Sequence, residues 1–128
     1  MVPFYLNKAG AGFPSPATDY IEEDIDLNIH LIKNVPATFV IRVQGKSMTD
    51  VGIYDGDLLV VDKSLKPKNF STVIANVHDE LVVKNFVKTK NEQFLTAGSK
   101  KIEDKITINN ESDIFIWGVV TYVIHSVY

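Results

Sequence analysis

The sequence contains no cysteine, so disulfide bonds and thiolate metal ligands are both excluded. It also lacks a long apolar run, because the longest nearly uncharged one covers residues 114–124. A membrane-spanning helix needs about 20 residues. No basic segment followed by an apolar one opens the chain, so a secretory signal peptide is not expected. With no export signal and no long apolar run, we expect a cytoplasmic protein without a membrane anchor.

Basic residues are not in excess either. Thirteen lysines and arginines stand against sixteen acidic residues, which gives a net charge of −3. Proteins that bind nucleic acid through its phosphates usually carry a basic patch, whereas here the lysines are scattered among acids. We therefore expect no direct nucleic-acid contact, although a partner that itself binds DNA is compatible with this charge. The length of 128 residues and the 45% apolar content are typical of one globular domain.

Residues 1–24 differ in composition from the rest of the chain. They contain the pairs Ala9-Gly10 and Ala11-Gly12, and Pro14 and Pro16 follow. Glycine loosens the backbone, and each proline favours an extended conformation in the residue before it. This pattern predicts a flexible, extended N-terminal arm, and an ordinary disordered tail is the simpler alternative.

Residues 25–128 are predicted to form one β-rich domain. Asp26 can cap a short helix that runs to about Lys33. After this helix, short apolar segments alternate with polar or glycine- and proline-containing breaks. The predicted strands cover residues 38–43, 58–61, 72–77, 81–87, 93–96, 105–108 and 114–123. Many short strands and little helix predict a compact, mostly antiparallel β domain.

The three histidines do not form a recognisable site. His30 lies on the predicted helix, His78 in a hairpin turn and His125 near the C-terminus, and none has metal-ligand spacing to another. No serine stands in a nucleophile-elbow pattern, although spacing alone leaves a Ser-His-Asp triad open. We therefore expect neither a metal nor another cofactor.

Ser47 has two interpretations. The segment Gly45-Lys46-Ser47 resembles the end of a phosphate-binding loop, but Val40 stands where that motif requires its first glycine. Ser47 follows a predicted strand, where a turn or N-cap serine is common. A serine at a strand end can also be a nucleophile, with neighbouring backbone N–H groups as an oxyanion hole. The local pattern alone favours the turn.

Lys84 lies in the predicted strand 81–87. Strand alternation puts it on one face with Val82 and Phe86, and the opposite face is apolar as well. A strand that is apolar on both faces is typically buried on both, and burial of an ammonium favours the neutral amine. The alternative is a solvated or edge-guarding face that Lys84 shares with other lysines. The pattern does not distinguish the two.

Four segments together resemble a known family. Residues 11–16, 45–48, 52–59 and 82–84 carry Ala-Gly-Phe-Pro-Ser-Pro, Gly-Lys-Ser-Met, Gly-Ile-Tyr-Asp-Gly-Asp-Leu-Leu and Val-Val-Lys in that order. This order is similar to that of UmuD-like members of the LexA/UmuD family of self-cleaving serine–lysine peptidases. The resemblance runs from about residue 11 to the C-terminus.

The resemblance implies a complete catalytic site. Ser47 matches the family nucleophile, Lys84 the general base, and Ala11-Gly12 the scissile bond. The backbone N–H groups of Ser47 and Met48 are then the expected oxyanion hole. The family mechanism implies no metal and no cofactor.

The resemblance also implies partners. UmuD-like proteins form homodimers, cleave themselves when stimulated by RecA–single-stranded-DNA filaments, and then join a Y-family polymerase subunit (UmuC-like) in translesion synthesis. Only 11 residues precede the implied cleavage site, so a repressor-type DNA-binding domain is not expected. Residues 69–71 and 96–99 depart from the family pattern. The alternative function is a non-cleaving polymerase accessory subunit that keeps the fold.

Overall fold

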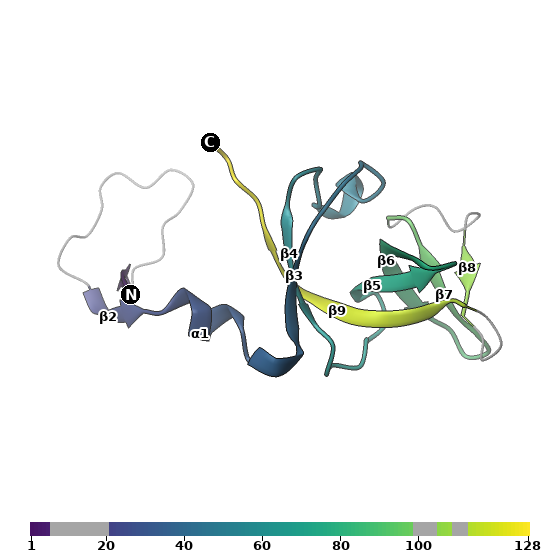
Figure 1. Cartoon of the computed structure of the whole chain (residues 1–128), viewed down its shortest axis with the longest axis horizontal. Coiled ribbons are helices and arrows are strands. Elements are labelled where there is room, and N and C mark those ends of the chain that lie inside the picture. Colours follow the sequence, from purple (N-terminus) through teal and green to yellow (C-terminus); the bar gives the residue numbers. More distant parts are fainter. Residues whose placement is uncertain (6–20, 99–104, 109–112) are drawn as a thin grey trace. The chain divides into compact units, whose positions relative to one another are not determined.

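The computed structural model describes residues 1–5, 21–98, 105–108 and 113–128 (Figure 1). The chain divides into two compact units, Met1–Lys33 and Asn34–Tyr128. The implied cleavage site, Ala11 and Gly12, lies outside the described residues. In the described part of the chain, no helix is long and apolar enough to cross a membrane.

The first unit contains a strand pair and a helix. Strands β1 (Val2–Tyr5) and β2 (Ile21–Ile25) pair antiparallel. Neither was predicted, because each is short and its partner lies far away in the sequence. Helix α1 (Leu27–Leu31) was predicted, and the Asp26 carboxylate accepts a hydrogen bond from the backbone N–H of Asn28 at 3.0 Å. The helix ends two residues earlier than expected because the next residue is extended. The flexibility of the arm stays a prediction.

The second unit is built on one antiparallel sheet, which confirms the predicted fold class. Its strand order is β3-β4-β9-β5-β6-β7-β8. Two short 3-10 turns, η1 (Val35–Ala37) and η2 (Thr49–Val51), flank the first strand. The strands are β3 (Thr38–Arg42), β4 (Leu58–Asp62), β5 (Thr72–Val77), β6 (Glu80–Lys88), β7 (Gln93–Thr96), β8 (Ile106–Thr107) and β9 (Phe115–Ile124).

Strand β9 joins the two halves of this sheet. It pairs with β4 on one side and β5 on the other, and both ladders contain a register shift. Such irregularities bend a strand and increase its twist. Gly118 is buried in β9, where a Cβ atom would lie 2.6 Å from a methyl group of Val61. A larger residue at this position would therefore collide with β4.

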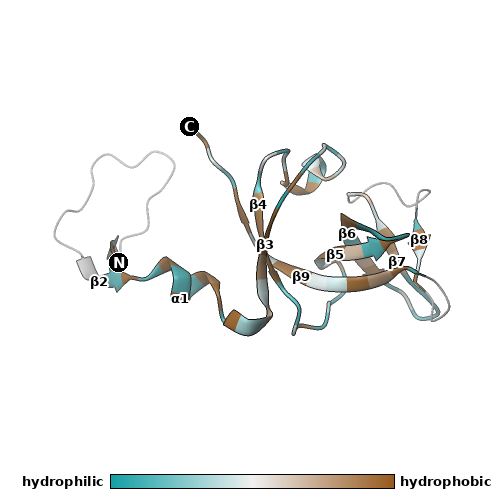
Figure 2. Cartoon of the chain, in the orientation of Figure 1, coloured by the Kyte–Doolittle hydropathy of each residue, from teal (hydrophilic) through white to brown (hydrophobic). Residues whose placement is uncertain are grey.

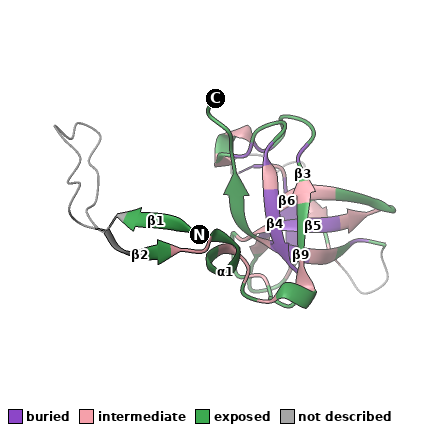
Figure 3. Ribbon diagram, turned by 60° about the vertical axis from the view of Figure 1, so that its left-hand side comes forward, coloured by how far each residue is buried: buried purple, intermediate pink, exposed green. Residues whose placement is uncertain are grey.

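Two apolar clusters form the core of the second unit. The first surrounds Leu59, Val61 and Ile74 and includes Met48, while the second surrounds Val73, Phe86 and Leu95. Figure 2 shows hydrophobic residues along β4 and β9, and Figure 3 shows that the buried ones concentrate in β4 and β5. Because Met48 belongs to the first cluster, the residue directly before it is held close to this core.

Candidate active site

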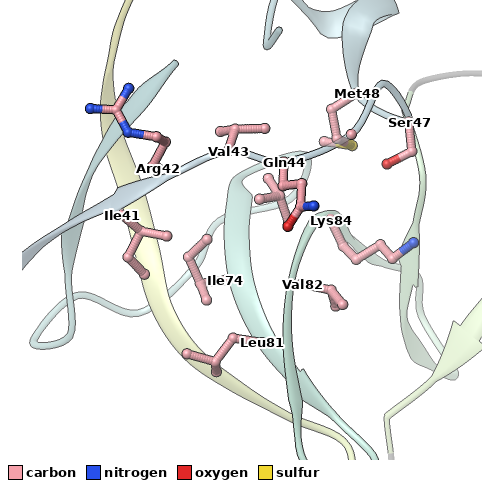
Figure 4. Close-up of a pocket in the computed structure, with 12 residues that line it drawn as sticks. Ile41, Arg42, Val43, Gln44, Ser47, Met48, Ile74, Leu81, Val82 and Lys84 are labelled. Carbon is pink, nitrogen blue, oxygen red and sulfur yellow. The ribbon is translucent and has the colours of Figure 1, made fainter. Parts of the chain in front are cut away.

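Ser47 and Lys84 line the same pocket, which has a volume of about 310 Å³. The chain after β3 forms one wall of the pocket, and β6 forms another. Figure 4 shows Lys84 extending toward the side of the pocket where Ser47 lies. The fold thus brings together two residues that the sequence places on separate segments.

The Ser47 loop, residues 43–48, is hydrogen-bonded to the turn before β4. The backbone N–H of Val43 donates to the carbonyl of Asp57 at 2.8 Å, and the N–H of Gly56 donates back to Val43 at 2.9 Å. Gly45 has a positive φ of 105°, which glycine adopts readily. Its N–H donates to the Asp55 carboxylate at 2.8 Å. The Asp-Gly-Asp motif at residues 55–57 therefore holds the Ser47 loop through these hydrogen bonds.

Ser47 itself is exposed, whereas the next residue is anchored. Met48 is buried, and its sulfur accepts a hydrogen bond from the N–H of Gly98 at 3.2 Å. The N-cap of η2 is Met48, so Ser47 is not a capping residue there. In the described ranges, the Ser47 hydroxyl has no hydrogen-bond partner, and the N–H groups of Ser47 and Met48 donate to none. A nucleophile and an oxyanion hole both require groups that are available in this way.

Lys84 is half-buried, which lies between the two alternatives that its strand pattern left open. Lys84 is partly exposed because the β6–β7 pairing ends at Asn85 and Thr96. The part of β6 before Asn85 has no described neighbour on the side where β7 pairs. The predicted strand itself is confirmed, and Phe86 on the same face is buried, so this face is not solvated throughout. Over the residues that the structure describes, Lys84 forms no ion pair.

A comparison with protein-family models matches residues 3–121 to the family described as peptidase S24-like. The chain belongs to the peptidase S24-like family. This S24-like match covers the segments that carried the resemblance from residue 11 onward, which confirms the recognition made from the motifs.

Several relatives of this S24-like chain are similar over nearly its whole length. It is 43% identical to protein ImpA of Salmonella typhimurium over 123 residues, which are 96% of this chain and 83% of the relative. It is 40% identical to protein MucA of Escherichia coli over 121 residues, covering 94% and 82%. The LexA repressor of Photorhabdus laumondii is 35% identical over 121 residues, which are 94% of this chain and 60% of the repressor.

The two histidines of the second unit do not line the pocket of this S24-like domain. His30 is in α1, His78 is in the turn between β5 and β6, and His125 follows β9. Neither His78 nor His125 is among the residues around Ser47 in that pocket. Among the described residues, no three histidine or acidic side chains are grouped closely enough to hold a metal ion. His78 and His125 are therefore not positioned as general bases for Ser47.

His125 instead pairs with Asp57. Its Nδ1 lies 2.5 Å from the Asp57 carboxylate, and the His125 ring packs against that of Tyr54 with centroids 5.3 Å apart. The backbone N–H of Tyr54 donates to the same carboxylate at 2.9 Å. No sequence signal predicts this pair, because its members are 68 residues apart and share no motif.

The Asp57 interactions lower the pKa of its carboxyl group. The largest cause is the hydrogen bond from the Tyr54 backbone N–H, and the contact with His125 adds to it, while burial opposes both. The ordinary value is 3.8. A lowered pKa in the folded state means that ionised Asp57 stabilises the fold above pH 3.8 and loses this effect as the pH falls through the folded-state pKa.

We therefore expect Asp57→Asn to lower the urea midpoint of unfolding at pH 7, and to lower it progressively less as the pH falls from 3.8 toward the folded-state pKa. Asparagine keeps a carbonyl oxygen for Tyr54 but has no charge to pair with His125. Urea titrations of both proteins between pH 7 and pH 3 measure the difference. The exposed Asp79→Asn variant is the control, since asparagine tolerates the positive φ of 68° at that turn. A deficit that did not change with pH would contradict the electrostatic origin.

Proposed function

We propose that the chain is a self-cleaving serine peptidase whose nucleophile is Ser47 and whose general base is Lys84. The observation that carries the proposal is the shared pocket of the two side chains in an S24-like chain. Serine and lysine suffice for peptide hydrolysis, because a neutral amine can accept the serine proton as the hydroxyl oxygen attacks. The proposed substrate is the protein's own Ala11–Gly12 bond.

The proposed reaction has two stages. The Lys84 amine takes the Ser47 proton, the Ser47 oxygen bonds to the Ala11 carbonyl carbon, and the N–H groups of Ser47 and Met48 stabilise the oxyanion. The C–N bond then breaks, and the Lys84 ammonium returns its proton to the departing Gly12 amine. Water hydrolyses the acyl-enzyme, with Lys84 again accepting a proton. The products end at Ala11 and begin at Gly12.

The free edge of β6 supports this choice of substrate. Before Asn85 that edge has no described neighbour beyond it, and Lys84 lies there. An extended segment can add to an exposed sheet edge through main-chain hydrogen bonds. The prolines at 14 and 16 favour such an extended arm. Small residues at positions 11 and 12 allow the backbone to approach the nucleophile closely.

We further propose that cleavage is stimulated by RecA–single-stranded-DNA filaments and that the cleaved homodimer joins a Y-family, UmuC-like polymerase in SOS mutagenesis. The similarity to ImpA and MucA, over more than nine tenths of this chain, supports a UmuD-like role. The net charge of −3 favours contact with protein assemblies over direct contact with DNA. These partners act on chromosomal DNA, so the proposal includes a cytoplasmic location.

Incubation with RecA, ATP and single-stranded DNA tests this function, and incubation at alkaline pH tests the chemistry alone. We expect mass spectrometry to detect a fragment that begins at Gly12. The basal rate should rise with pH as the neutral fraction of the lysine amine increases. A rate that stayed constant between about pH 6 and pH 10 would contradict lysine as the base. A chain that remained intact in every condition would favour the non-cleaving accessory subunit.

A further inference from the structure

We propose that Asp55 is a positioning residue that holds the Ser47 loop in its reactive geometry, an inference that rests on the proposed function. The Asp55 carboxylate accepts a hydrogen bond from the Gly45 backbone N–H at 2.8 Å. Gly45 precedes Ser47 by two residues and has a φ of 105°. Asp55 is therefore connected to the nucleophile through a very short stretch of backbone.

The turn that carries Asp55 is itself well supported. Gly56 has a φ of 89°, and its N–H donates to the Val43 carbonyl at 2.9 Å. The carbonyl of Gly56 accepts a hydrogen bond from the Arg42 guanidinium at 2.8 Å. Asp57 closes the same turn and is buried. The Asp55 carboxylate thus projects from a turn that several hydrogen bonds hold to the end of β3.

The Ser47 loop has little else to hold it. In the part of the chain that the structure describes, the Gly45–Asp55 bond is the only hydrogen bond from residues 44–47 to another segment. The remaining bonds run from Thr49 to the Lys46 carbonyl within the same turn. Val43 and Met48 are buried at either end, and the residues between them are exposed. Asp55 therefore restrains the middle of a segment that packing restrains only at its ends.

A catalytic side chain must be held within about 0.5 Å of its productive position. A misplacement of about 1 Å can slow a reaction about 100-fold. We therefore expect Asp55→Ala to slow self-cleavage by about 10- to 100-fold. Asp55→Asn keeps a carbonyl oxygen for the Gly45 N–H, so its rate should stay within about threefold of the unmodified protein. The role requires an acceptor, not a charge.

The test compares first-order cleavage rates of the full chain at one alkaline pH, at a temperature where every variant is folded. Asp62→Ala is the matched control, because the Asp62 carboxylate also accepts a backbone hydrogen bond in a turn, from Ser64 at 2.8 Å, but does not line the pocket. We expect its rate to stay within about threefold even where its melting temperature falls. If Asp62→Ala slowed cleavage equally, the effect of Asp55→Ala would be explained by lost stability, and the inference would be overturned.

Hydrogen exchange of the Gly45 amide provides a second readout. We expect exchange at least about tenfold faster in Asp55→Ala and little changed in Asp55→Asn. If the unmodified chain is cleaved and Asp55→Ala is cleaved equally fast, only the positioning role fails. Asp55→Asn as slow as Asp55→Ala would overturn it too, since the charge would then be the active feature. An unmodified chain that is never cleaved would overturn the proposed function instead, together with any role of Asp55 in it.

Discussion

Replacing Ser47 with alanine is expected to abolish the fragment that begins at Gly12, and Lys84→Met is expected to do the same. Alanine has no oxygen to attack the peptide bond, and methionine has no amine to accept the proton. Loss of a nucleophile or its base in a serine peptidase slows turnover by more than about 10⁴-fold. Mass spectrometry after incubation with RecA, ATP and single-stranded DNA should therefore show only the intact chain.

The variant Lys84→Arg tests whether Lys84 acts by accepting a proton or only by its positive charge. Arginine keeps the positive charge but does not lose its proton in proteins, so it should be as inactive as methionine. Lys88→Met is the control on the same strand, because Lys88 is exposed and does not line the pocket. Thermal unfolding of all variants checks that they are folded. Cleavage by Lys84→Arg at the rate of the unmodified chain would remove Lys84 from the role of base.

Gly98→Ala is expected to destabilise the domain by about 2–3 kcal/mol and to slow cleavage as well. Gly98 has a φ of 75°, and a Cβ atom there would lie 2.3 Å from a carboxylate oxygen of Asp50. Its N–H also donates to the buried sulfur of Met48. Movement of Gly98 or Asp50 would therefore disturb the anchor directly beside Ser47. Urea unfolding and the cleavage rate measure the two effects.

Gly52→Ala is a matched control for this substitution. Gly52 has a similar φ of 86°, but no atom lies within 4 Å of the position that its Cβ would occupy. It should carry the conformational cost of a positive φ, about 1–2 kcal/mol, without the collision. The difference between the two variants then measures the crowding at Asp50. If Gly98→Ala were no more destabilising than Gly52→Ala, the expected collision between residue 98 and Asp50 would be refuted.

The strands could be predicted where their signal was local. Residues 72–77 and 93–96 were predicted with the bounds that the structure shows, because apolar runs there end at clear turn residues. The Asp26 cap of α1 was also visible as a sequence signal. The strands β1 and β2 were not, since each is stabilised by pairing with the other across the arm. Short strands of this kind depend on a partner more than on their own residues.

The candidate site, like the strands, could be predicted from the sequence only in part. The sequence by itself identified Ser47 and Lys84 as candidates and, through the order of four motifs, the family that the comparisons confirm. Periodicity left open whether Lys84 is buried or on a solvated face. In the structure the β6–β7 pairing ends at Asn85, so Lys84 lines the pocket and is half-buried. Burial depends on which segments pack nearby, and alternation within one strand carries no information about them.

Tertiary structure alone decided which residues support the site. The Asp-Gly-Asp motif was visible in the sequence, but its bond to Gly45 spans 10 residues, and the Asp57–His125 contact spans 68. Local propensity determines strands, turns and the conformational freedom of a glycine, because these depend on neighbouring residues. Hydrogen-bond partners across the chain depend on strand order and register. The sequence therefore determined the chemistry that Ser47 and Lys84 can perform, and the fold determined their shared pocket and the support of the loop that carries Ser47.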